Sequence, residues 1–296
     1  MPSLDPLPDS GQDTVLGHFG FLPWELIHFS LPQRAVDGTV WTRQNGDRTL
    51  RITAGATQNP DGSALHVLPY GKYARAAILF LTTQAKVTNN PAVEISSSYR
   101  GYLEQLGIRW SHDSALEAAR QLRALAACSI SISTQTVDEN GEVHLQEVRF
   151  HFSKKTDIWF TAERDGLIDP TRPSTLVLSG DLFASVLERG IPVNLTAWRR
   201  LANETKSPMA LDIYTWLSCR LHGVTGLTRI SWEQLHEQFG STTEMRDFRR
   251  KFAQALELAK TVYPEANATI VRRMGGRGFS GLLLQPSQNA LESHLD

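Results

Sequence analysis

The second half of the chain places apolar residues at the spacing of helices and separates them with turn residues. Residues 207–223, SPMALDIYTWLSCRLHG, predict a helix with one apolar stripe. The residues of this stripe are Met209, Ile213, Trp216 and Leu217. Pro208 suits the first helical position, where its missing N–H would have no partner, and Gly223 suits the C-terminal end.

A shorter helix is predicted in ISWEQLHEQFG, residues 230–240. Ser231 and Gln234 have the spacing of a capping box, in which each side chain bonds the backbone N–H of the other residue. The apolar residues of one face are Trp232, Leu235 and Phe239. Gly240 then ends the segment.

A long helix is predicted from about Glu244 to Tyr263, before the stop at Pro264. Its apolar positions keep the helical period: Phe248, Phe252, Leu256, Ala259 and Val262. Residues 268–286, ATIVRRMGGRGFSGLLLQP, then have the pattern of a strand, a glycine-rich turn and a strand. This order of elements indicates a winged helix-turn-helix, in which the long helix enters a DNA major groove and the hairpin reaches nearby phosphates.

The first half repeats this order. Residues 70–87 predict an apolar helix, 98–108 a short helix and 111–129 a longer helix with a Ser or Asp N-cap. Strand-like runs follow within 129–160, and residues 174–190 predict a strand and a closing helix. In residues 142–152, Val143 and Leu145 are out of phase with the later apolar residues Val148, Phe150 and Phe152, which predicts a β-bulge.

An internal repeat follows from the matching order of elements. EQLG ends at Gly107 and EQFG ends at Gly240, 133 residues later (240 − 107 = 133). We therefore predict an α+β fold with tandem winged-helix (helix-turn-helix) domains. The expected divisions are an N-terminal tail and irregular or strand region (1–64), a first domain (65–190), a linker (191–206), a second domain (207–287) and a C-terminal tail (288–296).

Composition indicates a chain that can bury a core. Of its 296 residues, 41% are hydrophobic and 21% charged, and no apolar run reaches the roughly 18–20 residues of a membrane span. The start, MPSLDPLPDSGQD, has no apolar segment of the signal-peptide type, so we expect an acidic disordered tail. Cys128 and Cys219 are too few for a disulfide framework or zinc site, which predicts buried, inert thiols in a reducing cytoplasm.

Local charge changes this picture. The net charge of the whole chain is −1, which does not indicate a polyanionic partner. Residues 244–277, however, hold eight Lys or Arg and four Asp or Glu, a balance of +4 (8 − 4). Phosphate binding requires cationic side chains gathered on one face, and this stretch contains the predicted long helix and the first strand and glycine-rich turn of the hairpin.

The second domain supplies the main candidates for DNA contact. On the long helix, away from the apolar stripe, they are Arg246, Arg249, Arg250 and Lys251. Around the glycines of the hairpin they are Arg272, Arg273 and Arg277. An arginine offers two donors to guanine O6 and N7. The alternative is an ordinary solvated face, with the helix arginines paired to Glu244 and Asp247.

The first domain gives a weaker signal. We expect one face of its long helix to be buried (Leu116, Ala119, Leu122 and Ala126) and another to be exposed (Arg120, Gln121 and Ala124). Its candidate DNA contacts are Tyr99 and Arg100 at the short helix, Arg120, and Lys154 and Lys155 in an expected hairpin turn. The alternative is plain surface or a dimer interface, because sheet edges within 129–160 could pair with another chain.

The segment TAWRRLANETKS, residues 196–207, connects the two domains. Arg199 and Arg200 are candidate contacts to the DNA backbone. The alternative, which we favour, is an ordinary linker helix anchored by Trp198.

Motifs of catalysis are missing. YGK at residues 70–72 lacks the spacing of a nucleotide-binding loop, HEQFG at residues 236–240 lacks a second histidine, and GFSG at residues 278–281 is not a nucleophile elbow. We therefore expect no enzyme activity, no metal and no cofactor. The expected work is DNA binding, bending and opening.

Three segments resemble the RepA-type plasmid replication initiator family. They are LHVLPYGKYARAAILFLTTQA (65–85), SPMALDIYTWLSCRL (207–221) and ISWEQLHEQFG, and the resemblance spans roughly Leu65 to Pro286. It implies two winged-helix domains that bind repeats, called iterons, at a plasmid origin. It also implies a monomer for initiation, a homodimer that represses its own gene at an operator inverted repeat, opening of AT-rich DNA, and recruitment of a host initiator and replicative helicase.

Two other functions stay open at this point. One is a winged-helix transcriptional repressor or autoregulator without a role in initiation. The other is a nicking-type replication enzyme, against which stands the lack of a tyrosine with a paired-histidine motif.

Overall fold

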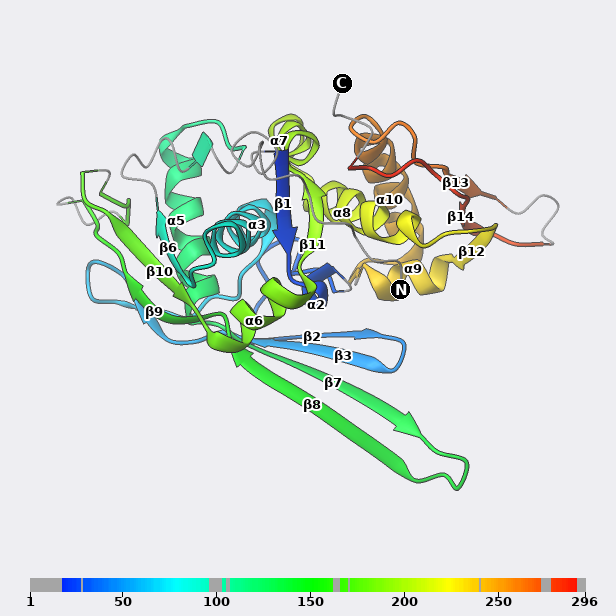
Figure 1. Cartoon of the computed structure of the whole chain (residues 1–296), viewed down its shortest axis with the longest axis horizontal. Coiled ribbons are helices and arrows are strands. Elements are labelled where there is room, and N and C mark those ends of the chain that lie inside the picture. Colours follow the sequence, from blue (N-terminus) through cyan, green and yellow to red (C-terminus); the bar gives the residue numbers. More distant parts are fainter. Residues whose placement is uncertain are drawn as a thin grey trace.

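The computed structural model describes residues 18–27, 29–95, 103–104, 107–161, 166–169, 171–239, 241–272 and 278–291. These residues form two winged-helix units, an N-terminal segment that touches both units, and a long two-stranded ribbon that projects from the body (Figure 1). The expected α+β fold with tandem winged-helix domains is confirmed.

The second unit has the predicted order of elements. It runs through α8 (Pro208–His222), β12 (Thr228–Ser231), α9 (Trp232–Gln238), α10 (Met245–Lys260), β13 (Ala268–Val271) and β14 (Gly281–Leu284). The wing sheet has the order β12-β14-β13 and is antiparallel throughout. Sequence patterning did not predict β12, a four-residue strand that adds a third member to the expected hairpin.

Local chemistry explains the start of α9 and its packing on α10. The predicted capping box is present: Ser231 Oγ accepts from Gln234 N at 3.2 Å, and Gln234 Oε1 accepts from Ser231 N at 2.9 Å. Behind it, Phe239 and Phe252 pack with ring centroids 5.3 Å apart. Such edge-on aromatic contacts fix the angle between the two helices more closely than aliphatic contacts would.

The first unit repeats this topology. It runs through α3 (Gly71–Thr88), β6 (Ala92–Ile95), α5 (His112–Ala127), β9 (Ser153–Asp157) and β10 (Ser174–Leu178), with the sheet order β6-β10-β9. Corresponding elements begin at similar offsets: 137 residues for α3 and α8 (208 − 71), 136 for β6 and β12 (228 − 92), and 133 for α5 and α10 (245 − 112). The predicted internal repeat is therefore present in the fold.

Only part of the predicted short helix of the first unit lies within the described residues, and Leu103 and Glu104 are helical there. Gly107 follows with a φ of +66°, and an added Cβ would lie 3.0 Å from the Cα of Arg199. A side chain at this position would thus meet both backbone strain and the backbone of the connecting helix.

A ribbon is inserted between α5 and β9. It consists of β7 (Ser129–Val137) and β8 (Val143–His151), which join the hairpin of β2 (Val40–Asn45) and β3 (Arg48–Thr53) in the order β2-β3-β7-β8. The predicted bulge is wrong, because β7 and β8 keep one register from Ser129↔His151 to Val137↔Val143. The change of apolar phase arises because Leu145 and Val148 lie on opposite faces of the ribbon and both are exposed.

The N-terminal and connecting segments join the two units. β1 (Phe19–Leu22) pairs with β11 (Ile191–Asn194), and α2 (Trp24–Ile27) follows β1. β4 (Thr57–Gln58) and β5 (Ala64–Leu65) form a small hairpin, and α6 (Gly180–Arg189) precedes β11. The connecting helix α7 (Leu195–Glu204) buries Trp198, as the linker interpretation predicts.

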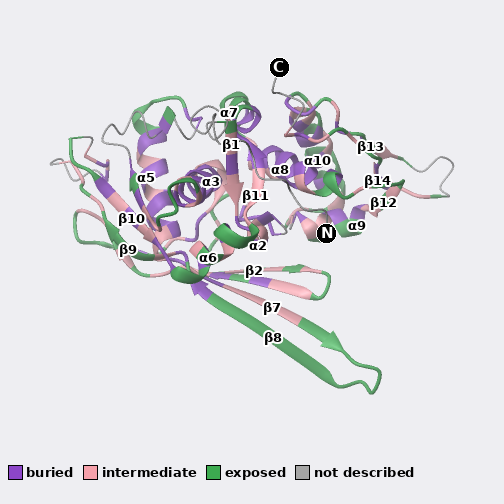
Figure 2. Ribbon diagram, viewed as in Figure 1, coloured by how far each residue is buried: buried purple, intermediate pink, exposed green. Residues whose placement is uncertain are grey.

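Burial is continuous through the centre of the molecule. Figure 2 shows buried residues along α3 and α8, whereas the outer part of the ribbon is exposed. The N-terminal region contributes to this core through Leu50 and Ile52 on β3. The two winged-helix units therefore pack on one another through their first helices.

Candidate nucleic-acid interface

A groove of about 830 Å³ lies between α10 and the wing of the second unit. Its charged lining residues are four arginines and one glutamate: Arg246, Arg249, Arg250, Arg272 and Glu233. Trp232, Ile270 and Ser280 line it as well. The groove therefore presents a concentration of positive charge between a helix and a β-sheet.

The helical period of α10 places the arginines in this groove. Phe248, Phe252 and Leu256 are buried against α8 and α9, as predicted from their spacing. Arg246, Arg249 and Arg250 follow the i, i+3, i+4 pattern on the opposite, exposed side. They lie in the N-terminal half of the helix, which is the half that reaches base edges in helix-turn-helix proteins.

Trp232 holds the walls of the groove together. Its ring packs edge-on against Phe248 and Phe252, with centroid distances of 6.3 and 5.8 Å. Its Nε1 donates a hydrogen bond to Ser280 Oγ at 3.1 Å, next to wing strand β14. One side chain thus connects α9, α10 and the wing, so the separation between helix and wing is fixed before any ligand binds.

The ion pairs of the groove arginines with described residues are weak. Arg249 Nη2 lies 4.0 Å from Glu233 Oε1, and Arg250 Nη2 lies 3.8 Å from Asp247 Oδ1. Both members of each ion pair are at least 44% exposed, and ion pairs between exposed side chains contribute less than about 1 kcal/mol. No ion pair or hydrogen bond joins Arg246 or Arg272 to a described residue. These guanidinium groups can therefore exchange water for phosphate or base edges at small cost.

The other second-unit candidates are placed as follows. Lys251 is exposed but lines a separate crevice of about 310 Å³ with Arg34, Trp41 and Met209, on another side of α10. Arg273 and Arg277 lie outside the described residues. The structure therefore brings together four of the seven second-unit candidates.

The outer face of α5 differs from that of α10. Gln121 and Ala124 are buried, so the prediction that they face outward is wrong. The segment before α3 covers Gln121, whose Oε1 accepts a hydrogen bond from Tyr70 N at 2.8 Å. Arg120 is only half-exposed, donates to Tyr70 Oη at 3.1 Å and lies 3.5 Å from Glu117. This face is partly closed and carries acidic as well as basic groups.

Known proteins share parts of this sequence and this fold. The family of plasmid-encoded RepA proteins matches residues 68–234, more than half of the chain. The chain belongs to this RepA family. The matched region begins just before α3 and ends within α9, so it covers the first unit, the connecting segment and the start of the second unit.

Solved structures of RctB domains 2 and 3 share the fold of this RepA-family chain. One has 10% sequence identity and a TM-score of 0.55, with 89% of this chain and 96% of the other covered. A selenomethionine derivative of the same two domains has 9% identity and a TM-score of 0.57, with 88% and 94% covered. None of the curated proteins matches the chain.

The remaining candidates of the RepA-family chain are dispersed. Lys154 and Lys155 are exposed on strand β9 rather than in a hairpin turn, because the chain enters the wing sheet directly after Phe152. Arg199 is half-buried on α7, and burial lowers the pKa of its guanidinium. Arg200 is exposed, and its Nε lies 2.9 Å from Glu204 Oε1. Tyr99 and Arg100 lie outside the described residues.

Sequence analysis missed several exposed residues at matching places of the first unit. In the first wing, Trp159 is 44% exposed, and the Cζ of Arg172 lies 4.3 Å from the centre of its ring. Arg109 and His112 are exposed at the start of α5, although the position that matches Arg246 at the offset of 133 residues is Asp113 (246 − 133 = 113). Aligning the two halves at their EQLG and EQFG segments would have drawn attention to the start of α5.

Other chemistry is sparse in the described part of the chain. Among these residues, no group of three or more His, Cys, Asp or Glu is arranged to hold a metal ion. Burial raises the pKa of Cys128 to about 12, and it also raises that of Cys219, which is half-buried rather than buried as predicted. No described helix is long and apolar enough to cross a membrane.

Proposed function

We propose that this RepA-family protein initiates plasmid replication by binding iteron repeats in double-stranded origin DNA. The observation that carries the proposal is the groove of the second unit, where four arginines line the space between α10 and the wing. Family membership supports a role in plasmid replication. The work of the protein is binding energy used to bend and open DNA, without catalysis.

In the proposed complex, the N-terminal half of α10 lies in a major groove. Arg246, Arg249 and Arg250 then face base edges or the phosphates that border the groove, and Arg272 faces the phosphates beside the wing. A bidentate contact between arginine and guanine contributes about 1–3 kcal/mol of discrimination. The first unit adds contacts through the exposed cations Lys154 and Lys155. Opened AT-rich DNA would then be passed to a host initiator and replicative helicase.

Footprinting on the DNA beside the plasmid gene tests this function. We expect protection of several direct repeats of about 20 base pairs, or two helical turns. Arg250→Ala should weaken binding to these repeats. Arg220→Ala is the matched control, because Arg220 is an exposed arginine of the same unit that does not line the groove. Protection confined to one inverted repeat at the promoter would refute initiation at iterons and favour a transcriptional repressor.

A repressor function has one observation of its own in favour. β8 is the outer strand of its sheet, so its edge can pair with a second copy. Four apolar residues along the ribbon are at least half-exposed: Val137, Val143, Leu145 and Val148. We propose that two chains pair along β8 to form the dimer that represses at an inverted repeat.

The dimer proposal is tested by the double variant Leu145→Lys/Val148→Lys. Lysines along an open edge oppose pairing between strands, so analytical ultracentrifugation should show a monomer where the parent shows a dimer. Binding to single repeats should be unchanged, because the ribbon does not line the groove. A parent protein that stays monomeric at high concentration would contradict pairing along β8.

A further inference from the structure

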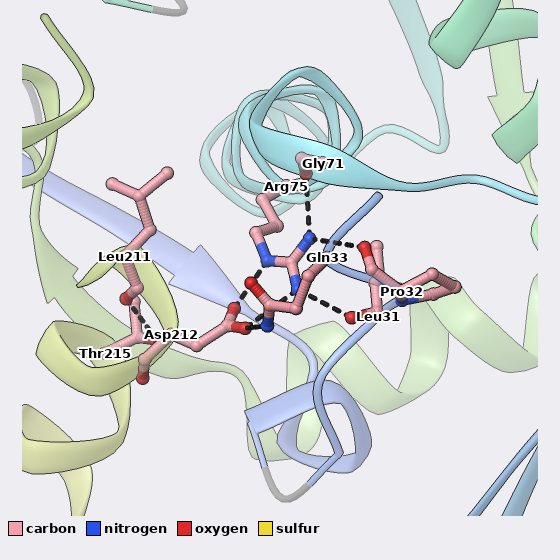
Figure 3. A network of polar contacts seen from close by, with 8 residues as sticks. All are labelled: Leu31, Pro32, Gln33, Gly71, Arg75, Leu211, Asp212 and Thr215. Carbon is pink, nitrogen blue, oxygen red and sulfur yellow. Dashed lines mark hydrogen bonds and ion pairs between the residues drawn. The ribbon is translucent and has the colours of Figure 1, made fainter. Parts of the chain in front are cut away.

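A buried ion pair joins the first helices of the two winged-helix units. Arg75 on α3 and Asp212 on α8 form a bidentate contact, with Nε 2.5 Å from Oδ1 and Nη2 2.8 Å from Oδ2 (Figure 3). Their side chains are 8% and 14% exposed. The two residues lie 137 positions apart in sequence, so this contact exists only when both units are folded and packed together (212 − 75 = 137).

All five N–H groups of the Arg75 guanidinium have an acceptor. Besides the two bonds to Asp212, Nη1 donates to the carbonyl oxygens of Gly71 and Pro32 at 2.8 and 3.2 Å. Nη2 also donates to the carbonyl oxygen of Leu31 at 2.7 Å. The planar guanidinium therefore has one orientation that satisfies every donor.

Asp212 is held equally closely. Gln33 Nε2 donates to its Oδ2 at 2.9 Å, so the carboxylate binds both α3 and the segment between α2 and β2 (Figure 3). Bidentate pairs of this kind are directional, whereas apolar contacts between helices are not. The apolar surfaces of α3 and α8 favour contact between the units, and the ion pair selects one geometry for that contact.

Arg75 and Asp212 occupy equivalent positions of the internal repeat. Each is the fifth residue of its helix, counted from Gly71 in α3 and Pro208 in α8. Equivalent positions of two similar units meet only near the axis that relates them. If two copies of the same unit packed in this way, two arginines or two aspartates would meet instead. The opposite charges therefore favour packing of the first unit against the second.

We propose that Arg75 and Asp212 are positioning residues that hold the two winged-helix units in a single relative orientation. Because of this, they set the separation between the DNA segments that both units contact at once. The second statement rests on the proposed function, whereas the first concerns the free protein. The two can therefore be tested separately.

Pulsed EPR on the full chain, without DNA, tests the orientation. Spin labels at Asp113→Cys on α5 and Glu257→Cys on α10, two exposed positions, report the distance between the units in a Cys219→Ser background. We expect a single narrow distance in the parent and a broadened or displaced one in Asp212→Asn. Asn keeps the shape of the side chain and removes the charge that orients Arg75.

Glu25→Gln is the matched control. Glu25 is also a buried carboxylate, and it accepts from Ser185 and pairs with Arg189 at 2.9 Å, but this cluster joins α2 to α6 and contains no residue of the second unit. Glu25→Gln should lower thermal stability and leave the distance between the spin labels narrow. If Asp212→Asn lowers stability to a similar extent and keeps the parental distance, the pair is only stabilising and the proposal is wrong.

If Asp212→Asn does not fold, the double variant Arg75→Met/Asp212→Leu replaces it in the EPR experiment. Apolar pairs of similar volume often replace buried ion pairs without loss of stability. It too should show a broadened distance, and a narrow parental distance in this folded variant would overturn the proposal.

Binding to the footprinted repeat tests the consequence for DNA. Insertion of about five base pairs, half a helical turn, between the two protected segments should reduce parental binding to that of one unit alone. The same insertion should reduce binding of Arg75→Met/Asp212→Leu by a smaller factor. Equal losses would refute control of spacing by this pair. A parent that binds no repeat would refute the proposed function and leave the EPR result to decide the role of the ion pair.

Discussion

Comparing Arg246→Ala with Arg272→Ala distinguishes a contact to DNA bases from a contact to DNA phosphates within the groove. Arg246 lines the groove from the first turn of α10 and has no ion pair or hydrogen bond to a described residue. Arg272 lines the same groove from the wing and is also exposed. Neither substitution removes a described interaction, so any loss of DNA affinity reflects the interface rather than the stability of the fold.

The structure gives the two variants different expected magnitudes. Arg246 lies where a recognition helix meets base edges, so its loss should cost about 1–3 kcal/mol, or roughly 5- to 150-fold in affinity for the repeat. Binding to unrelated DNA should change much less. Arg272 lies where a wing meets phosphates, so Arg272→Ala should weaken binding to all sequences. It should also reduce the dependence of log K on log salt by about one unit.

Fluorescence anisotropy with repeat and scrambled duplexes at several salt concentrations measures both effects. The ratio of the two affinities should fall in Arg246→Ala and stay near the parental value in Arg272→Ala. Arg220→Ala should match the parent in both respects. The assignment of α10 to the major groove is refuted if Arg246→Ala lowers both affinities equally and changes only the salt slope.

Four further predictions concern stability and reactivity. Ser231→Ala removes the capping box of α9 and should lower the free energy of unfolding in urea by about 1 kcal/mol; an unchanged midpoint would contradict it. Asp212→Asn leaves Arg75 buried without its counterion and should cost about 3–5 kcal/mol in the same assay, with much of the loss absent in Arg75→Met/Asp212→Leu. The pKa of Cys128 is about 12 in the folded chain, against an ordinary value of 9.0, so the thiol ionises in the unfolded chain at pH values where it stays protonated in the folded chain. The free energy of unfolding should therefore fall as the pH rises from 9 to 12. At pH 8, thiol labelling followed by mass spectrometry should modify Cys219 well before Cys128, and equal rates would show that Cys128 is more accessible than the structure indicates.

Local patterns were sufficient to predict much of the second unit. The Ser231–Gln234 box and the stripe through Phe248 and Phe252 depend on residues within one or two helical turns, and the structure has both. Strand β12 was missed because a four-residue strand has too few positions to show a period, and it forms only when β14 is beside it.

Features that depend on distant segments could not be predicted in this way. Gln121 lies on what the helical period indicates as an outer face, but the chain around Tyr70 covers it. The pairing of Arg75 with Asp212 depends on how two separate units pack, and a buried arginine in an apolar helix gives no indication of its partner. The candidate site was predictable only in part. The helical period of α10 identified three arginines of the groove, whereas Lys251 was assigned to the same face and lies on another.

The pairing of β1 with β11 has a consequence for how the protein is made. Leu22 pairs with Ile191, 169 residues later in the chain (191 − 22 = 169). At ribosomal speeds of about 5–20 residues per second, the first strand waits roughly ten to thirty seconds for its partner to be synthesised. During that interval FGFL has no strand beside it, so nascent chains should be most vulnerable to aggregation and most dependent on chaperones before residue 194 emerges from the ribosome.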